Sequence, residues 1–107
     1  MSTAPKAEIL NLAEMASYQT GSVVSRQITK TELGNVTLFA FDEGQELSEH
    51  TAPFDALVHV VEGNAEIVIS GKSFELKSGE AIIMPANEPH AVKATSQFKM
   101  LLTMIRA

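Results

Sequence analysis

The chain has 107 residues, 45% of them hydrophobic, and a formal net charge of −5, which is typical of one domain with a single core. Its few Lys and Arg residues are scattered singly, which argues against binding to nucleic acid, and no apolar run approaches the roughly 20 residues needed to span a bilayer. Cysteine is absent, which excludes disulfides, iron–sulfur clusters and thiolate zinc sites.

The N-terminal segment predicts a short helical turn. Ile9, Leu12, Ala13 and Ala16 recur at helical spacing, which indicates one or two turns near residues 11–17. The opening MSTAPKAEIL has neither a basic region nor a continuous apolar stretch behind it, so we expect no secretory signal and a cytoplasmic location.

From Ser22 onward the sequence consists of short β-rich runs separated by turn residues. After the second run, a loop is expected to extend through Pro53. Short strands with a turn about every eight to twelve residues predict an all-β sandwich or closed double-sheet barrel, with its core over about residues 22–106. The predicted strands are Val23–Thr29, Val36–Phe41, Ala56–Val61, Glu66–Ser70, Ser73–Leu76, Ala81–Met84, His90–Lys93 and Phe98–Ile105.

Two of these runs, residues 36–41 and 98–105, are apolar on both faces. One face of each strand is expected to fill the barrel. The other face then needs a second apolar surface, either the N-terminal segment or another subunit. The pattern therefore predicts a homodimer as the assembled form.

Two motifs in the chain resemble those of the cupin family. The matching residues are Gly44, His50 and Gly63 in the first motif and Gly79, Pro85 and His90 in the second. The resemblance covers about residues 36–105 and is to small single-domain cupins of the RmlC-like, conserved-barrel (cupin-2) type. It implies an all-β jelly roll, also called a double-stranded β-helix, that forms one cupin domain over residues 1–107.

The resemblance also implies where a metal site would lie. In the family, three histidines and one glutamate commonly bind a divalent metal ion, and their positions here are His50, Ala52, Ala56 and His90. Because two of these positions hold alanine, the implied ligand set is incomplete. His50 and His90 remain the candidate ligands for Fe, Mn, Ni or Zn.

Nearby carboxylates do not clearly replace the missing ligands. Asp55 is one residue out of phase with the inner face, so a bulge would be needed to turn it inward. Glu46 lies roughly 13 Å from His50 along an extended strand, whereas Glu88 is only roughly 6.6 Å from His90. The third histidine, His59, is expected to face outward.

A ligand pocket is predicted inside the barrel. Alanine in place of two polar ligands makes the interior wider and more apolar, and methionine walls adapt to varied shapes. The residues expected to line this pocket are His50, His90, Phe41, Phe54, Met84, Met100 and Met104.

Two functions stay open at this point. The first is a module that binds a small organic molecule in the barrel, with His50 and His90 as its polar contacts and no complete metal-ligand set. The second is a metal-dependent cupin enzyme (a dioxygenase, isomerase or lyase) that holds a divalent ion on the same two histidines. Fold resemblance cannot choose between them, because one barrel supports many chemistries.

Overall fold

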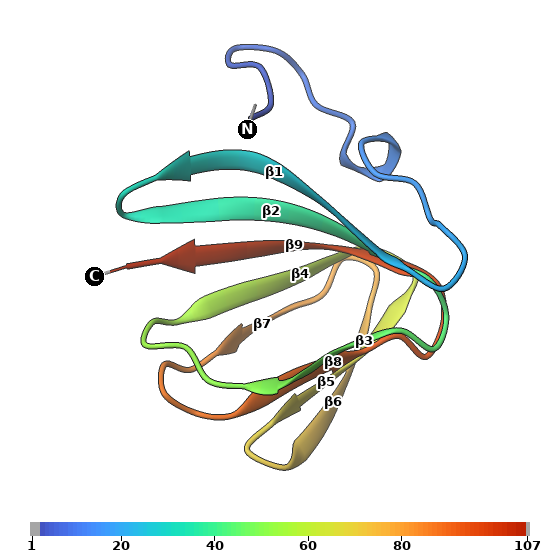
Figure 1. Cartoon of the computed structure of the whole chain (residues 1–107), viewed down its shortest axis with the longest axis vertical. Helices are drawn as coiled ribbons and strands as arrows, with labels where there is room; N and C mark the ends of the chain where they lie inside the picture. The colour runs from blue at the N-terminus through green and yellow to red at the C-terminus, as the bar shows by residue number, and fades with distance from the viewer. Residues whose placement is uncertain (1–2, 107) are drawn as a thin grey trace.

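The computed structural model describes residues 3–106, and its strands form two facing antiparallel sheets (Figure 1). The five-stranded sheet has the order β1-β2-β9-β4-β7, and the four-stranded sheet has the order β3-β8-β5-β6. In chain order the elements are the 3₁₀ turn η1 (Leu12–Glu14), β1 (Val23–Thr31), β2 (Gly34–Phe41), β3 (Glu46–His50), β4 (Ala56–Glu62), β5 (Asn64–Ile69), β6 (Lys72–Lys77), β7 (Ala81–Met84), β8 (His90–Lys93) and β9 (Phe98–Ile105).

The predicted all-β jelly roll with a short N-terminal helical turn is confirmed. One strand, β3, was not predicted from the sequence. Its residues are polar and largely exposed apart from Leu47, so no apolar alternation marks it. Backbone pairing with β8 holds β3 in the sheet instead, with Leu47 opposite Val92. The strand predicted from Val36 also begins two residues earlier, because Gly34 already pairs with Ile105 as part of β2.

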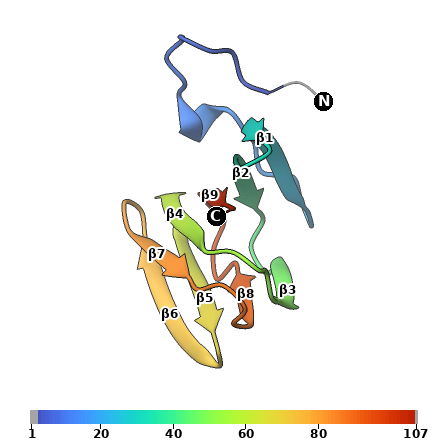
Figure 2. The ribbon, with the colours of Figure 1, turned by 90° about the vertical axis from the view of Figure 1, so that its left-hand side faces the viewer.

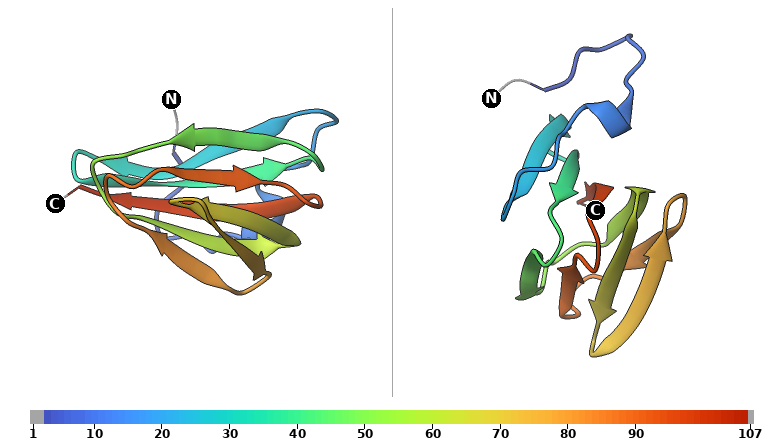
Figure 3. Two further views of the ribbon diagram at one scale, coloured as in Figure 1. Left: turned by 90° about the horizontal axis from the view of Figure 1, so that it is seen from below. Right: turned by 90° about the vertical axis from the view of Figure 1, so that its right-hand side faces the viewer.

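The core lies between the two sheets, which are seen as separate layers in Figures 2 and 3. Every second residue of β4 and β5 points into it, as period-two alternation requires. At one end of the core, the rings of Phe41 and Phe98 stack with centroids 4.5 Å apart, and both side chains are fully buried.

The N-terminal segment covers part of the outer face of the five-stranded sheet. Figures 1 and 2 show it beyond β1 and β2, on the side away from the four-stranded sheet. Ala16 packs there in a small cluster with Leu38 and Ala40, and partly buried Tyr18 and Leu101 border this cluster. The second apolar face of β2 is therefore covered by Met15, Ala16 and Tyr18 of the same chain.

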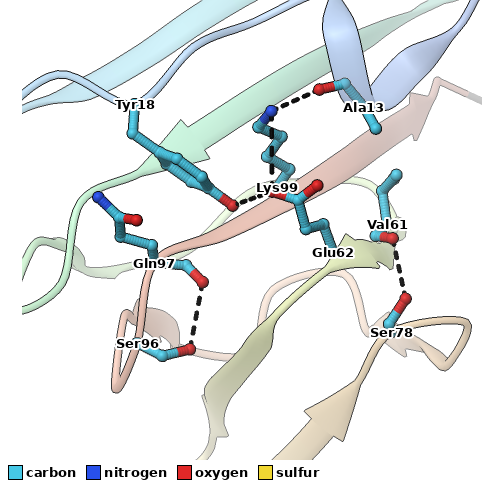
Figure 4. Close-up of polar contacts among 8 residues, drawn as sticks. All are labelled: Ala13, Tyr18, Val61, Glu62, Ser78, Ser96, Gln97 and Lys99. Atoms are coloured by element: carbon cyan, nitrogen blue, oxygen red, sulfur yellow. Dashed lines mark hydrogen bonds and ion pairs between the residues drawn. The ribbon is translucent and has the colours of Figure 1, made fainter.

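A polar cluster fastens this segment to the sheet (Figure 4). Lys99, on β9, is 7% exposed; its ammonium donates to the carbonyl of Ala13 and lies 3.7 Å from the carboxylate of Glu62. The hydroxyl of Tyr18 donates to the same carboxylate at 2.5 Å. Burial, followed by the Glu62 carboxylate, raises the pKa of Tyr18 above its ordinary value. We call these four residues the Lys99 cluster.

Among residues 3–106, no helix is long and apolar enough to cross a membrane.

Candidate functional site

The two predicted histidines meet at the mouth of the barrel. His50 ends β3 and His90 begins β8, and the two residues are cross-strand partners in the four-stranded sheet. Their Nε2 atoms are 3.1 Å apart, and their rings meet edge to face at 73°. Pairing of the two strands thus brings together imidazoles that are 40 positions apart in the sequence.

The hydrogen bonds define where the protons of this pair reside. The Nδ1 atom of His50 lies 2.8 Å from the carbonyl oxygen of Ser48, which only accepts hydrogen bonds, so Nδ1 carries the proton. In a neutral His50 ring, Nε2 is then an acceptor, and the Nε2–H of His90 donates to it. The Nδ1 atom of His90 is buried and has no hydrogen-bond partner in the described chain.

The two rings differ in their contact with water. His50 is exposed at the rim, whereas His90 is 4% exposed. Burial lowers the pKa of His90, the neighbouring His50 lowers it further, and the backbone of Glu88 acts in the opposite direction. Burial and the neighbouring imidazole therefore both favour the neutral form of His90.

This pKa shift predicts a pH-dependent stability. Because the folded state binds a proton at His90 less readily than the unfolded chain, the free energy of unfolding should decrease as the pH is lowered from about 7 to about 5. The His90→Gln variant should lose this component. Urea unfolding at a series of pH values measures it, and equal pH slopes for both proteins would contradict the assignment.

Behind the histidines lies a narrow apolar cavity with a volume of about 40 Å³. A single water needs about 10–15 Å³ of such space, whereas pockets for organic ligands typically measure about 300–1,000 Å³. The cavity therefore has room for no more than an ion, a water or the small end of a larger molecule. Its lining residues are Leu47, His50, Ala52, Ala56, Met84, His90, Val92, Met100, Leu102 and Met104.

The structure brings together five of the seven residues expected to line the pocket. Phe41 and Phe54 are not among the lining residues. Phe41 stacks on Phe98 deeper in the core, so its ring serves packing. Phe54 lies in the bend between β3 and β4, where strand parity does not apply, and its ring faces an outer groove.

This outer groove is larger than the cavity behind the histidines, with a volume of about 530 Å³. It lies on the outer face of the five-stranded sheet, where Leu57, Ile83 and Ile105 are exposed. The guanidinium of Arg106 lies 5.5 Å from the centroid of the Phe54 ring. No histidine lines the groove, so it is separate from the imidazole pair.

The residues present do not fit the family's four-ligand metal site. Ala52 and Ala56 line the cavity, at the positions where the resemblance places the missing ligands. Two of the carboxylates considered as replacements make other hydrogen bonds: Asp55 accepts from the backbone N–H of Ala86 at 2.8 Å, and Glu88 accepts from the hydroxyl of Ser70 at 2.7 Å. Within residues 3–106, no group of three or more His, Cys, Asp or Glu residues is arranged to hold a metal ion.

His59 lies outside this site. It alternates on β4 with the fully buried Val58 and Val60, so its ring projects from the opposite face of the sheet. Its partners on the two neighbouring strands are Ala81 and Leu101.

Three lining residues were not anticipated from the sequence: Leu47, Val92 and Leu102. Val92 and Leu102 share the phase of His90 and Met100 on their strands, and this alternation was the available signal. Leu47 gave no such signal, because β3 is otherwise polar.

Comparison with known proteins agrees with this architecture. The family model described as "Cupin domain" matches residues 37–106. A conserved Streptococcus pyogenes protein of unknown function has a crystal structure that is similar over 100% of this chain and 96% of its own, with 33% identity and a TM-score of 0.92. A cupin superfamily protein from Desulfitobacterium hafniense covers 99% and 97%, with 24% identity and a TM-score of 0.91.

A third structure extends the comparison to a longer protein. The cupin 2 conserved barrel domain protein from Leptotrichia buccalis is 42% identical, with a TM-score of 0.88, over 91% of this chain but only 47% of its own. No functionally curated protein matches the chain. The family match covers well over half of the sequence, and this chain therefore belongs to the cupin family.

Proposed function

We propose that the protein is a binding module that holds a small ligand at the mouth of its barrel through His50 and His90. The observation that supports this proposal is the 3.1 Å approach of the two Nε2 atoms at the entrance of an apolar cavity. The two rings also combine one exposed and one buried imidazole, so a ligand could reach the pair from solvent at the rim and be held against the buried ring.

The cavity limits what the ligand can be. About 40 Å³ admits an ion or a group of one or two heavy atoms, so an organic ligand would leave most of its bulk outside or require the methionine side chains to move. The ligand needs a group that interacts with imidazole nitrogen. The organic molecule expected from the sequence stays one form of this proposal.

A metal-dependent enzyme is the second candidate, and one distance favours it. Two imidazole ligands at about 2.05 Å from one ion have nitrogen atoms roughly 2.9 Å apart at a right angle and roughly 3.3 Å apart at the tetrahedral angle. The observed separation of 3.1 Å lies between these values. The alanines at positions 52 and 56 weigh against this candidate, because a divalent ion would have only two protein ligands.

A homodimer also stays a prediction. The N-terminal segment covers the outer face over β1 and β2, whereas the outer groove beside β7 presents the exposed side chains of Ile83 and Ile105. An apolar surface of this kind is typical of a protein contact.

The imidazole rings provide a direct test. In ¹⁵N-edited NMR spectra of the untagged protein, we would add short-chain carboxylates, amides and mono- and divalent metal ions one at a time. At least one probe should shift the ring resonances of His50 and His90 while leaving those of the outward-facing His59 unchanged. His90→Gln should abolish the response, and His59→Gln should retain it. If every probe left the pair unchanged, the proposed site would be wrong.

The same preparation separates the two candidates. Near-stoichiometric Fe, Mn, Ni or Zn that is lost in both His50→Ala and His90→Ala would favour the enzyme. Failure of all four ions to bind would favour the module.

A further inference from the structure

Methionine side chains surround the place where the family's glutamate is missing. Ala56 pairs with Met84 on β7 and with Met104 on β9, so a methionine flanks it on each side. Directly opposed residues on neighbouring strands lie about 4.5–5.5 Å apart. Because Ala56 contributes only a methyl group, both thioether side chains have room to extend over it into the cavity, and both line that cavity.

Met100 lines the same cavity, so three of the chain's five methionines share it with the two histidines. Met84 and Met100 are almost completely buried. Within the cavity lining, the atoms able to bind a metal ion through side chains are therefore imidazole nitrogens and thioether sulfurs, with no carboxylate among them. Thioethers are soft ligands that select Cu(I), whereas Mn, Mg and similar hard ions prefer oxygen.

Charge and size point to the same class of ion. All the lining ligands are neutral, so a bound ion keeps its full charge in an apolar interior. The Born cost of burying an ion rises with the square of its charge, so a divalent ion costs about four times as much as a monovalent one. A volume of about 40 Å³ accommodates a single ion without displacing the core.

The imidazole pair is arranged to bind such an ion. The two Nε2 atoms are at a separation suited to ligands of one metal, and the Nδ1–H of His50 is already fixed by the carbonyl of Ser48. Metal-binding histidines typically donate their second ring N–H in this way, which fixes the ring orientation. Binding also requires His90 to move its proton from Nε2 to the buried Nδ1 and to bring Nδ1–H within hydrogen-bonding reach of an acceptor, for which the neighbouring backbone of Glu88 is the candidate.

We infer that the ligand of the barrel mouth is Cu(I), held by Nε2 of His50 and His90 together with the thioether sulfur of Met84 or Met104. This inference rests on the proposed function and names the ligand class of that site. It differs from the family's divalent site in its ligands, its charge and its preferred metal.

The test uses the full-length protein under anaerobic conditions, with Cu(I) supplied as its complex with the chromophoric chelator bicinchoninate. The protein should remove one Cu(I) per chain from the chelator. The double variant Met84→Leu/Met104→Leu keeps the apolar volume but removes both sulfurs, and its affinity should fall by roughly tenfold or more. Met15 packs against Ala16, Leu38 and Ala40 on the outer face of the sheet, so Met15→Leu should retain the wild-type affinity.

A second readout reports the ligand atoms directly. Ag(I), a redox-inert substitute, should shift the methyl resonances of Met84 or Met104 and the ring resonances of both histidines in NMR spectra. Circular dichroism melting of each variant establishes that it is folded before its affinity is compared.

The outcomes distinguish this inference from the proposed function. Failure to compete for Cu(I), or wild-type affinity in a folded double variant, would overturn the Cu(I) assignment. If an organic probe or another ion still shifted the two histidines, the proposed site would survive that result. If no probe of any kind shifted them, both would be wrong.

Discussion

Gly63→Ala is expected to lower the free energy of unfolding by about 2–4 kcal/mol, which combines backbone strain with a steric clash. Gly63 has a φ of +79°, a conformation that costs energy for any residue with a Cβ. An added Cβ would also overlap the carbonyl oxygen of Gln97 and approach the Cβ of Phe98 to 2.9 Å. Both contacts involve β9 or the residue before it, which cannot move without disturbing the Phe41–Phe98 stack.

The chain contains a matched control for this experiment. Gly71 has a φ of +81°, almost the same as that of Gly63, but an added Cβ there would meet no atom within 4 Å. Gly71→Ala should therefore show only the strain, about 1 kcal/mol. Urea unfolding of both variants measures the difference. Similar losses in the two proteins would mean that the close approach to β9 is relieved by a small shift.

Restoring the family's ligands should create a divalent metal site. In the double variant Ala52→His/Ala56→Glu, the imidazoles of His50 and His90 are joined by a third imidazole and a carboxylate inside the same cavity. The apo form should lose roughly 1–3 kcal/mol, because larger and more polar side chains enter an apolar space. Added Mn²⁺ or Ni²⁺ should restore about 2.7 kcal/mol at a concentration one hundred times the dissociation constant.

Thermal unfolding with and without each ion measures this gain. Wild-type protein should show no comparable stabilisation, and adding His90→Ala to the double variant should remove it. A double variant that folds and is unaffected by either ion would show that the four positions do not converge. That result would contradict the correspondence between this chain and the family's motifs.

The sequence predicted most strands because their apolar alternation and turn residues are local signals. It predicted the meeting of His50 and His90 only through the cupin resemblance, since no local pattern links residues on separate strands. β3 was missed because its exposed polar residues are kept in place by pairing with β8, a long-range interaction. The volume of the cavity depends on how the methionine side chains pack in three dimensions. Hydrophobic patterns along the sequence therefore could not predict that volume.

The two aromatic assignments show the same limit. Phe54 was expected inside because phenylalanine is usually buried, but the bend after Pro53 places its ring in the outer groove. Phe41 was expected at the ligand and instead stacks on Phe98. Residue type indicated burial, and only the path of the backbone defined which apolar space each ring occupies.

The contacts of the Lys99 cluster limit how far the chain can be shortened when a fragment of it is expressed. A clone trimmed to the family match at residues 37–106 would lose β1 and the start of β2, and Lys99 would lose the carbonyl of Ala13 and the neighbouring ring of Tyr18. Of the partners in the cluster, Lys99 would then keep its ion pair with Glu62, and the apolar outer face of the sheet around Leu38 and Ala40 would be exposed to water. The family match thus leaves out residues whose contacts bury the outer face of the sheet, and we expect fusion partners or purification tags to be tolerated better when they are attached upstream of the 3₁₀ turn.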